Sequence, residues 1–260
     1  MTEEQQVISA FRNSGVSLAL AWAHRSAART TLDTITPALG FHTDATRSPA
    51  QRELLIDRID RVAQCRSYAP DPHLPTVGRD LLHQELHPDE PLTDDILLPP
   101  GTVDRNNLKG SHGWRFEEWQ WLCATFRYGR VNNMRWESDL RQQVAAQECP
   151  DHPTLFSPSE EDQIETPQID LSNTLILAQA LDVTTNQSQL FLGRPRLGAR
   201  GSSPWYWLYD LLGATPDEGR VGLPRTPLAP LPTAPREVAD APMRLRPAPG
   251  SPGKRSSDQG

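Results

Sequence analysis

The sequence predicts an α+β fold, with an N-terminal helical bundle, then a small antiparallel β-sheet built on a hairpin with a covering C-terminal helix, then a disordered tail. Three observations lead to this prediction. Apolar side chains recur with helical spacing over the first 63 residues. Two strand-like segments flank a polar turn after residue 174, and prolines are concentrated near the C-terminal end.

The first helix is expected to begin at Thr2, because Thr2 and Gln5 have the spacing of a capping box. Val7, Ile8 and Phe11 would supply its apolar face. The Asn-Ser-Gly cluster at 13–15 is typical of a helix end, so a helix of about three turns is expected.

Two further helices are expected before residue 65. One spans 16–36, because the chain cannot continue as helix into Pro37. The next begins with Ser48 as its N-cap and Pro49 in its first turn. Its apolar stripe has helical spacing and consists of Leu55, Ile56, Ile59, Val62 and Ala63.

Residues 66–110 are rich in proline and acidic side chains, and we expect irregular chain there with one short helix near 77–86. The stretch 113–131 is dense in aromatic residues, which are expected to lie in the core. The part from Trp121 to Val131 is apolar on both faces and fits a buried strand or a helix. Its β-branched and aromatic residues favour the strand.

The clearest strand pattern covers residues 174–181 and 189–197, which flank the polar turn 182–188 and predict a β-hairpin. Ser203 and Pro204 then have the pattern of a helix start. A short helix over 205–212, ended by Gly213, is expected to cover one face of the hairpin.

The distribution of proline and charge predicts the domain organisation. Residues 216–260 contain ten prolines and no aromatic residue, so they are expected to be disordered. The 52 residues 142–193 contain eight acidic side chains and no lysine or arginine. The expected parts are a helical, aromatic-rich body (1–147), an acidic proline-containing linker (148–170), the hairpin with its helix packed on the body (171–214) and a disordered tail (215–260).

Charge and composition exclude several classes of protein. A net charge of −7 argues against a protein that coats nucleic acid through bulk charge. The longest apolar run, 16–23, is far shorter than the roughly 20 residues of a membrane span, and the acidic first residues are unlike a secretory signal. Three cysteines at unrelated spacings form neither a disulfide framework nor a zinc knuckle. A cytoplasmic protein with reduced thiols is expected.

No motif assigns a catalytic residue. The segment His83-Gln84-Glu85-Leu86-His87 places two histidines four residues apart, a spacing that can chelate zinc from one helix face. The metalloprotease pattern requires glutamate directly after the first histidine, and this sequence has Gln84 there. Nucleophile-elbow, phosphate-loop and dinucleotide-binding patterns are absent from the sequence. We therefore expect no metal and no cofactor, and the sequence favours a protein that is not an enzyme.

Arg194, Arg196 and Arg200 surround the glycine-rich segment 198–201, which opens onto the expected helix start. Backbone amides at a helix start can hold an anion, so these arginines are the candidate anion or nucleic-acid site. The alternative is a plain loop whose arginines are solvated.

A short motif lies within the acidic linker. His152-Pro153-Thr154-Leu155-Phe156 is similar to the Gln-x-x-Leu-Phe peptide by which many bacterial replication and repair proteins bind the DNA sliding clamp. His152 stands where that peptide has glutamine. The resemblance implies that Leu155, Phe156 and His152 bind a protein partner, and the alternative is that Leu155 and Phe156 fold back onto the body.

Four runs resemble segments of an uncharacterised family of actinobacterial proteins: LLIDRIDRV (54–62), WQWLC (119–123), LGRPRL (192–197) and PWYWLYDLL (204–212). The resemblance covers roughly residues 1–213 and leaves out the tail. It implies one co-folding unit with a variable tail, and it supplies no activity and no catalytic residues.

Taken together, the sequence favours a non-enzymatic cytoplasmic interaction protein that binds a protein partner, either a basic protein or a DNA sliding clamp, through its acidic linker and aromatic surface. The alternative is a nucleic-acid-associated accessory factor or enzyme, linked to replication or repair, that uses the arginines at 194–200. If those arginines gather with Arg127 and Arg130 in one concave patch, the alternative is favoured.

Overall fold

The computed structural model describes residues 1–34, 44–70, 91–152, 170–198 and 202–213, all of which belong to one compact unit. The expected helix near 77–86, the motif at 83–87 and the tail from 214 onward lie outside these residues. In the part of the chain that is described, no helix is both long and apolar enough to cross a membrane.

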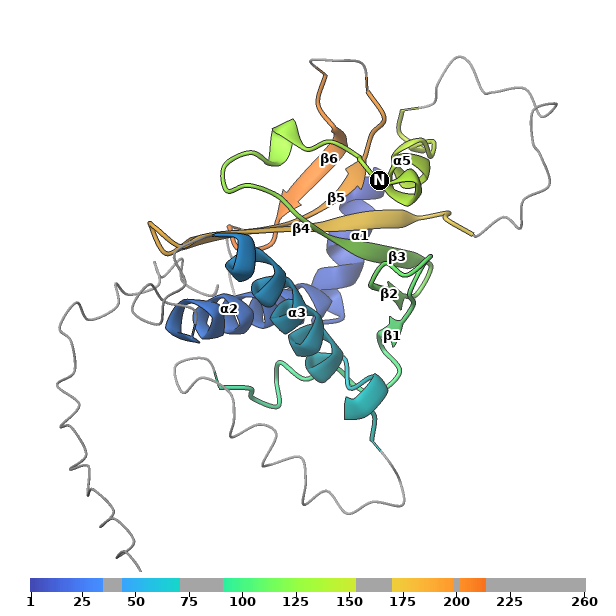
Figure 1. Ribbon diagram of the computed structural model, residues 1–260. Helices are drawn as coiled ribbons and strands as arrows, with labels where there is room; N and C mark the ends of the chain where they lie inside the picture. The colour runs from blue at the N-terminus through green and yellow to red at the C-terminus, as the bar shows by residue number, and fades with distance from the viewer. Residues whose placement is uncertain (35–43, 71–90, 153–169, 199–201, 214–260) are drawn as a thin grey trace, which may run out of the picture. The chain divides into compact units, whose positions relative to one another are not determined.

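Six strands form a single mixed sheet in the order β1-β2-β3-β4-β5-β6 (Figure 1). They are β1 (Asp104–Arg105), β2 (Gly113–Phe116), β3 (Trp119–Thr125), β4 (Thr174–Asp182), β5 (Gln187–Pro195) and β6 (Trp205–Asp210). β3 and β4 run parallel, with Trp121 opposite Leu175, and all other neighbours are antiparallel. With the helices before it, this sheet confirms the predicted α+β class.

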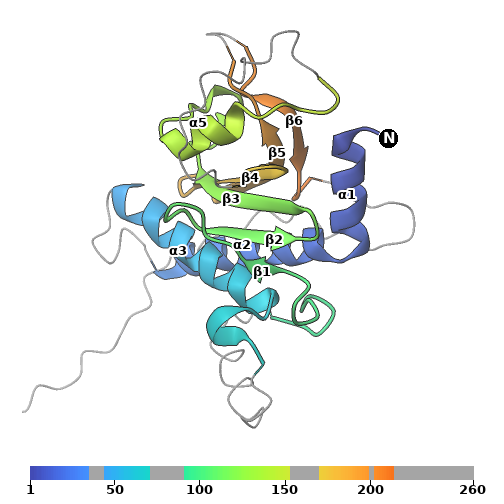
Figure 2. The same cartoon turned by 90° about the vertical axis from the view of Figure 1, so that its right-hand side faces the viewer.

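Helices cover both faces of the sheet (Figure 2). The elements α1 (Glu3–Asn13), α2 (Val16–Thr34) and α3 (Asp44–Val62) contribute to one apolar core, and α5 (Asp139–Ala145) contributes to the other. Alternation along β3 sends Trp121 and Cys123 towards the first core and Leu122 and Ala124 towards the second. The three N-terminal helices therefore pack on one another and on one face of the sheet.

The predicted start of α1 is confirmed. Thr2 accepts a hydrogen bond from the Gln5 backbone N–H, and the Gln5 side chain accepts one from the Thr2 backbone N–H. Gly15, with φ of +83°, makes the turn into α2 in a conformation that favours glycine. The predicted start of α3 is wrong by five residues, because the helix already begins at Asp44 and Pro49 lies inside it.

The central strands agree with the sequence patterns. Residues 119–125 form β3, although the strand stops before Phe126 instead of continuing to Val131. The predicted hairpin is confirmed as β4 and β5, whose last register pair is Asp182 opposite Gln187. The aromatic residues at 114, 119 and 121 are buried, as expected for core side chains.

The expected covering helix over 205–212 is wrong, because residues 205–210 form strand β6 beside β5. Trp205 and Leu208 join the core on the α5 side, whereas Trp207 joins the core on the α1 side. The adjacent residues Trp207 and Leu208 take opposite faces, as in an extended strand, and aromatic residues favour strands. The register shift opposite Arg194 and Pro195 accounts for Trp205 and Trp207 lying on different faces although they are two residues apart. The cap-like Ser203-Pro204 pair precedes a strand instead.

The segment expected to be a linker lies in sequence between two strands that pair with each other. β3 belongs to the part predicted as the body and β4 to the part predicted to pack on it, yet the two strands pair directly. The chain from 126 to 173, which includes α5, therefore connects two neighbouring strands of one sheet.

Candidate functional site

A buried carboxylate joins the start of the chain to its last strands. Glu3, the first residue of α1, is 3% exposed. Its Oε2 accepts hydrogen bonds from Nε1 of Trp207 at 2.8 Å and from Sγ of Cys149 at 3.4 Å. The guanidinium Nε of Arg194 lies 3.7 Å from Oε1 of Glu3. Helix α1, strands β5 and β6, and the chain just before residue 150 therefore meet at Glu3.

Arg194 is an interior residue with 3% exposure. Its Nη1 donates to the carbonyl of Thr174 at 3.3 Å and its Nη2 to the carbonyl of Glu148 at 2.8 Å. The alternation of β5 explains the burial, because Arg194 shares a strand face with the core residues Leu190 and Leu192. Arg194 thus neutralises Glu3 and does not face a ligand in solvent.

The other two arginines of the predicted anion site do not join it. Arg196 is exposed, and its guanidinium lies over the ring of Tyr206, 5.4 Å from the centroid. Arg200 lies outside the described residues. The sequence-predicted cluster is therefore divided between the interior and the surface.

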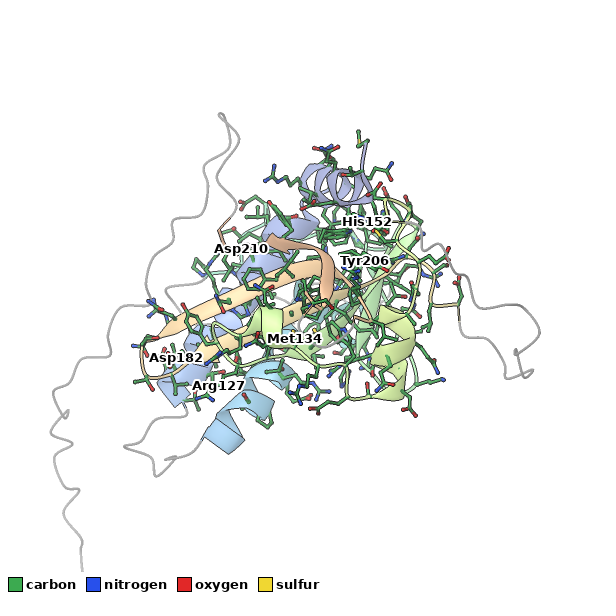
Figure 3. All side chains as sticks on the ribbon, turned by 90° about the horizontal axis from the view of Figure 1, so that it is seen from above. Arg127, Met134, His152, Asp182, Tyr206 and Asp210 are labelled. Atoms are coloured by element: carbon green, nitrogen blue, oxygen red, sulfur yellow. The ribbon has the colours of Figure 1, made fainter. Side chains whose placement is uncertain are left out.

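Arg127 and Arg130 do not gather with these residues either. The hydroxyl of Tyr128 donates to Oε1 of Gln187 at 2.6 Å, and the backbone N–H of Gly129 donates to Oε1 of Gln189 at 2.8 Å. These contacts place the loop that carries Arg127 and Arg130 beside the start of β5, whereas Arg194 lies near the end of that strand. Figure 3 shows the same separation, with Arg127 near Asp182 and far from Tyr206.

The start of the acidic segment 148–170 is held against α1 and β6. The backbone N–H of Glu3 donates to Oδ2 of Asp151 at 2.6 Å, and the backbone N–H of His152 donates to the carbonyl of Cys149 at 2.9 Å. The exposed ring of His152 stacks on Tyr206 of β6, with centroids 5.6 Å apart and an interplanar angle of 14° (Figure 3). We call Glu3, Cys149, Asp151, His152 and Tyr206 the segment anchor.

The far end of the segment is also attached to the fold. Nε2 of Gln120, on β3, donates to the carbonyl of Asp170 at 2.9 Å. The carboxylate of Asp170 accepts hydrogen bonds from the hydroxyl and the backbone N–H of Ser172, and these bonds lower the pKa of Asp170. Residues 153–169, which include Leu155 and Phe156, lie between these two attachments and outside the described residues.

The sequence predicts His152 as a docking residue and does not indicate the other members of the segment anchor. Glu3 has the pattern of an ordinary first-turn acid of a helix, and its partners lie 146 or more residues away. Tyr206 was placed in a predicted helix. Only the strand conformation of β6, which puts Tyr206 beside His152, identifies it.

The cysteines are not poised for nucleophilic chemistry. All three are free and buried. Burial raises the pKa of Cys65 and of Cys123 to about 12, and burial also raises the pKa of Cys149. Within the described ranges, no group of three or more His, Cys, Asp or Glu side chains could hold a metal ion.

Comparison of this chain with protein-family models, with curated proteins and with solved structures finds no match. The resemblance to an actinobacterial family therefore stays a prediction, and the functional argument rests on the geometry of the fold.

Proposed function

We propose that this protein is a non-enzymatic, cytoplasmic interaction protein that binds a protein partner through the acidic segment 148–170, with Leu155, Phe156 and His152 as the docking residues. The observation that carries the proposal is the attachment of both ends of this segment to one folded unit. His152 is held at Tyr206, and Asp170 is held at Gln120.

Because both ends of the segment are attached to the fold, the segment loses less conformational entropy when a partner binds it, and this favours docking. Consecutive Cα atoms are about 3.8 Å apart, so Leu155 lies at most about 11 Å from the Cα of His152. A partner that contacts Leu155 and Phe156 therefore also reaches the segment anchor. Short anchored peptides bind in this way, with a few apolar side chains in a pocket of the partner.

The charge of the segment supports a basic contact surface on the partner. The stretch 142–193 contains no lysine or arginine, so its eight carboxylates are not balanced within the same stretch. A basic groove would be attracted to it, and that attraction would weaken with salt. A DNA sliding clamp is the first partner to test, because 152–156 is similar to a clamp-binding peptide.

The test compares proteins that co-purify from the native host with wild-type protein and with the double variant Leu155→Ala, Phe156→Ala. The matched control is Thr154→Ala, Ser157→Ala, which alters the flanking residues of the same segment. We expect one partner to be retained by wild type and control and lost by the double variant. If wild type and double variant retain the same proteins, the docking proposal is wrong.

A further inference from the structure

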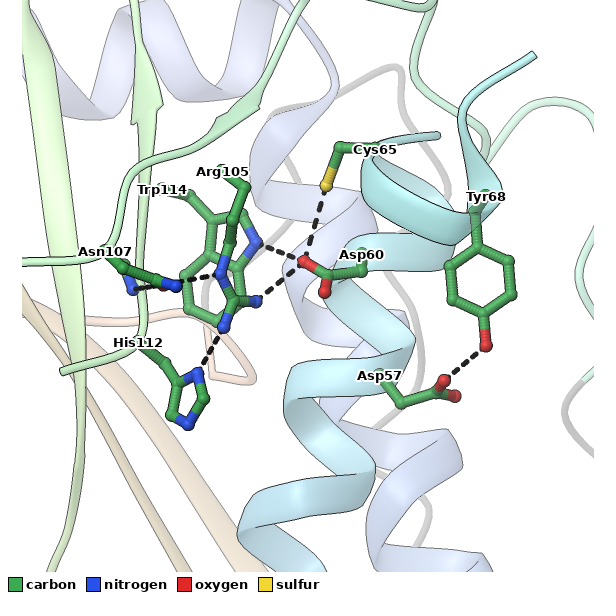
Figure 4. Close-up of polar contacts among 9 residues, drawn as sticks. Asp57, Asp60, Cys65, Tyr68, Arg105, Asn107, His112 and Trp114 are labelled. Atoms are coloured by element: carbon green, nitrogen blue, oxygen red, sulfur yellow. Dashed lines mark hydrogen bonds and ion pairs between the residues drawn. The ribbon is translucent and has the colours of Figure 1, made fainter. Parts of the chain in front are cut away.

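A second polar cluster joins α3 to the β1–β2 end of the sheet (Figure 4). Oδ1 of Asp60, on α3, accepts hydrogen bonds from Nη1 of Arg105 and from Nε1 of Trp114, both at 2.8 Å. The thiol of Cys65 donates to the same oxygen at 3.3 Å. The side chains of Arg105 and Asp60 are each 8% exposed, so this ion pair is shielded from bulk water.

Every nitrogen of the Arg105 guanidinium has a partner in this cluster. Nη1 is bonded to Asp60, Nε donates to Oδ1 of Asn107 at 2.7 Å, and Nη2 contacts Nδ1 of His112. The guanidinium also lies over the ring of Trp114, 4.3 Å from its centroid. These contacts hold Arg105 in one orientation, with Nη2 directed at His112.

The contact with Arg105 determines the protonation state of His112. An arginine guanidinium carries only donors and keeps its proton in proteins, so Nδ1 of His112 must be the acceptor. A neutral imidazole whose Nδ1 accepts a hydrogen bond carries its own hydrogen on Nε2. A proton added to Nδ1 would place two donors and two positive charges against each other, and the contact would break.

The charged groups that act on His112 belong to β1 and α3. Burial lowers the pKa of His112 most, and the positive charges of Arg105 and Arg52 lower it further. The negative charges of Glu53 and Asp60 act in the opposite direction, although Asp60 is already bonded to Arg105. The cluster therefore favours a neutral His112, as the geometry of its contact with Arg105 requires.

The ring of His112 can leave the cluster while the main chain stays in place. His112 is half-buried and directly precedes β2, which begins at Gly113. The carbonyl of His112 accepts a hydrogen bond from the backbone N–H of Cys123 at 3.2 Å. A Cβ added to Gly113 would lie 2.5 Å from the carbonyl oxygen of Asn106. Because the backbone is held and packed this closely, a change of side-chain rotamer is the movement open to His112.

We propose that the contact between His112 and Arg105 is an acid-sensitive switch that controls the access of water to the buried Asp60–Arg105 pair. At neutral pH the imidazole covers Nη2 of Arg105. On acidification the imidazole takes a proton from water and turns into solvent, so water reaches Asp60 and the Cys65 thiol bonded to it. Histidine is suited to this role because its charge changes between about pH 5 and 8. The switch lies at the β1–β2 end of the sheet and is independent of the docking proposed at β6.

Nuclear magnetic resonance of the histidine rings in the full-length protein tests the protonation state, and His112→Gln assigns the signals of His112. We expect the neutral ring of His112 to carry its hydrogen on Nε2 and to titrate below the ordinary histidine pKa of about 6.5. The proposal is overturned if the hydrogen lies on Nδ1, or if His112 titrates at or above that ordinary value.

Thiol labelling tests the access of water to the cluster. The reagent is dithiodipyridine, which reacts with thiols at acid pH, and mass spectrometry of peptides identifies the labelled cysteine. Between about pH 7.5 and pH 5, labelling of Cys65 in wild type should become about tenfold faster relative to His112→Gln, whose neutral amide oxygen can still accept from Arg105. The matched control is Lys109→Gln, which removes an exposed charge from the same turn and should behave like wild type.

Cys149 separates local opening from unfolding of the whole chain. It is bonded to Glu3, which contacts β6 at the opposite edge of the sheet from β1. We expect the labelling of Cys149 to stay slow over the same pH range. The proposal is overturned if Cys65 and Cys149 become reactive together, because acid then unfolds the protein as a whole. It is also overturned if acid does not accelerate the labelling of Cys65 in wild type, or accelerates it equally in His112→Gln.

Discussion

Replacement of Glu3 by alanine should be strongly destabilising, although Glu3 is only the third residue of the chain. The side chain of Glu3 is 2% exposed and that of Arg194 is 3% exposed, so neither charge is hydrated by bulk water. Removal of one partner of a buried ion pair leaves the other charge uncompensated, which costs about 3–5 kcal/mol. Glu3→Ala also removes the acceptor of the Trp207 indole N–H, bonded at 2.8 Å.

The assays are urea unfolding, which gives the free energy of unfolding, and thermal unfolding, which gives Tm, both followed by tryptophan fluorescence. For a folded unit of this size, about 4 kcal/mol corresponds to a fall in Tm of roughly 8–16 °C. The matched control is Glu4→Gln, because Glu4 is the next acidic residue of the same helix turn and is only partly buried. We expect the control to change the free energy of unfolding by less than about 0.5 kcal/mol.

A double variant distinguishes the ion pair from a simple loss of packing. Glu3→Gln combined with Arg194→Met removes both charges and keeps a carbonyl acceptor for the Trp207 indole. The double variant should be more stable than Arg194→Met alone, because no unpaired carboxylate then remains in the interior. If Glu3→Ala and Glu4→Gln have the same stability, the claim that Glu3 anchors the fold is refuted.

Three further predictions follow from burial and composition. His24 is fully buried with neither ring nitrogen bonded, and its pKa is lowered to about 3, mainly by burial. Because the unfolded state takes up a proton below pH 6.5 and the folded state does not, wild type should lose about 3 kcal/mol of stability to His24 between pH 7 and pH 4.5. His24→Leu should show a smaller loss in urea titrations at the two pH values, and an equal loss would contradict the assignment. Burial raises the pKa of all three thiols, those of Cys65, Cys123 and Cys149. They should therefore react with a thiol reagent at pH 8 only after denaturation. Rapid labelling of the native protein would show that they are accessible. A chain ending at Asp217 should keep its Tm within a few degrees of the full chain, because the sequence beyond it is proline-rich and lacks aromatic residues; a larger fall in a thermal scan would contradict this.

Local patterns were sufficient to predict the elements whose determinants lie close together in sequence. The capping box of α1 joins residues three apart, and the β4–β5 hairpin joins residues that face each other across a short turn. The burial of the aromatic residues at 114, 119 and 121 also follows from their density alone.

The errors occurred where distant residues decide the outcome. A cap-like Ser203-Pro204 pair precedes β6, but the free edge of β5 offers this strand backbone partners that no local pattern reveals. The parallel pairing of β3 with β4 joins residues about 50 positions apart. Arg194 was predicted at a surface site because its partner, Glu3, lies at the other end of the chain.

The measurement that tests the central claim most directly is the affinity of the purified partner for the wild-type protein and for Leu155→Ala, Phe156→Ala, determined by calorimetry alongside the Tm of each protein. Burial of a leucine or a phenylalanine side chain contributes about 1.5–3 kcal/mol, so loss of both should weaken binding at least a hundredfold. The Tm should stay within about 2 °C of wild type, and the Thr154→Ala, Ser157→Ala control should bind normally. A Tm that falls by many degrees while the affinity is unchanged would place Leu155 and Phe156 in the fold and contradict the docking function.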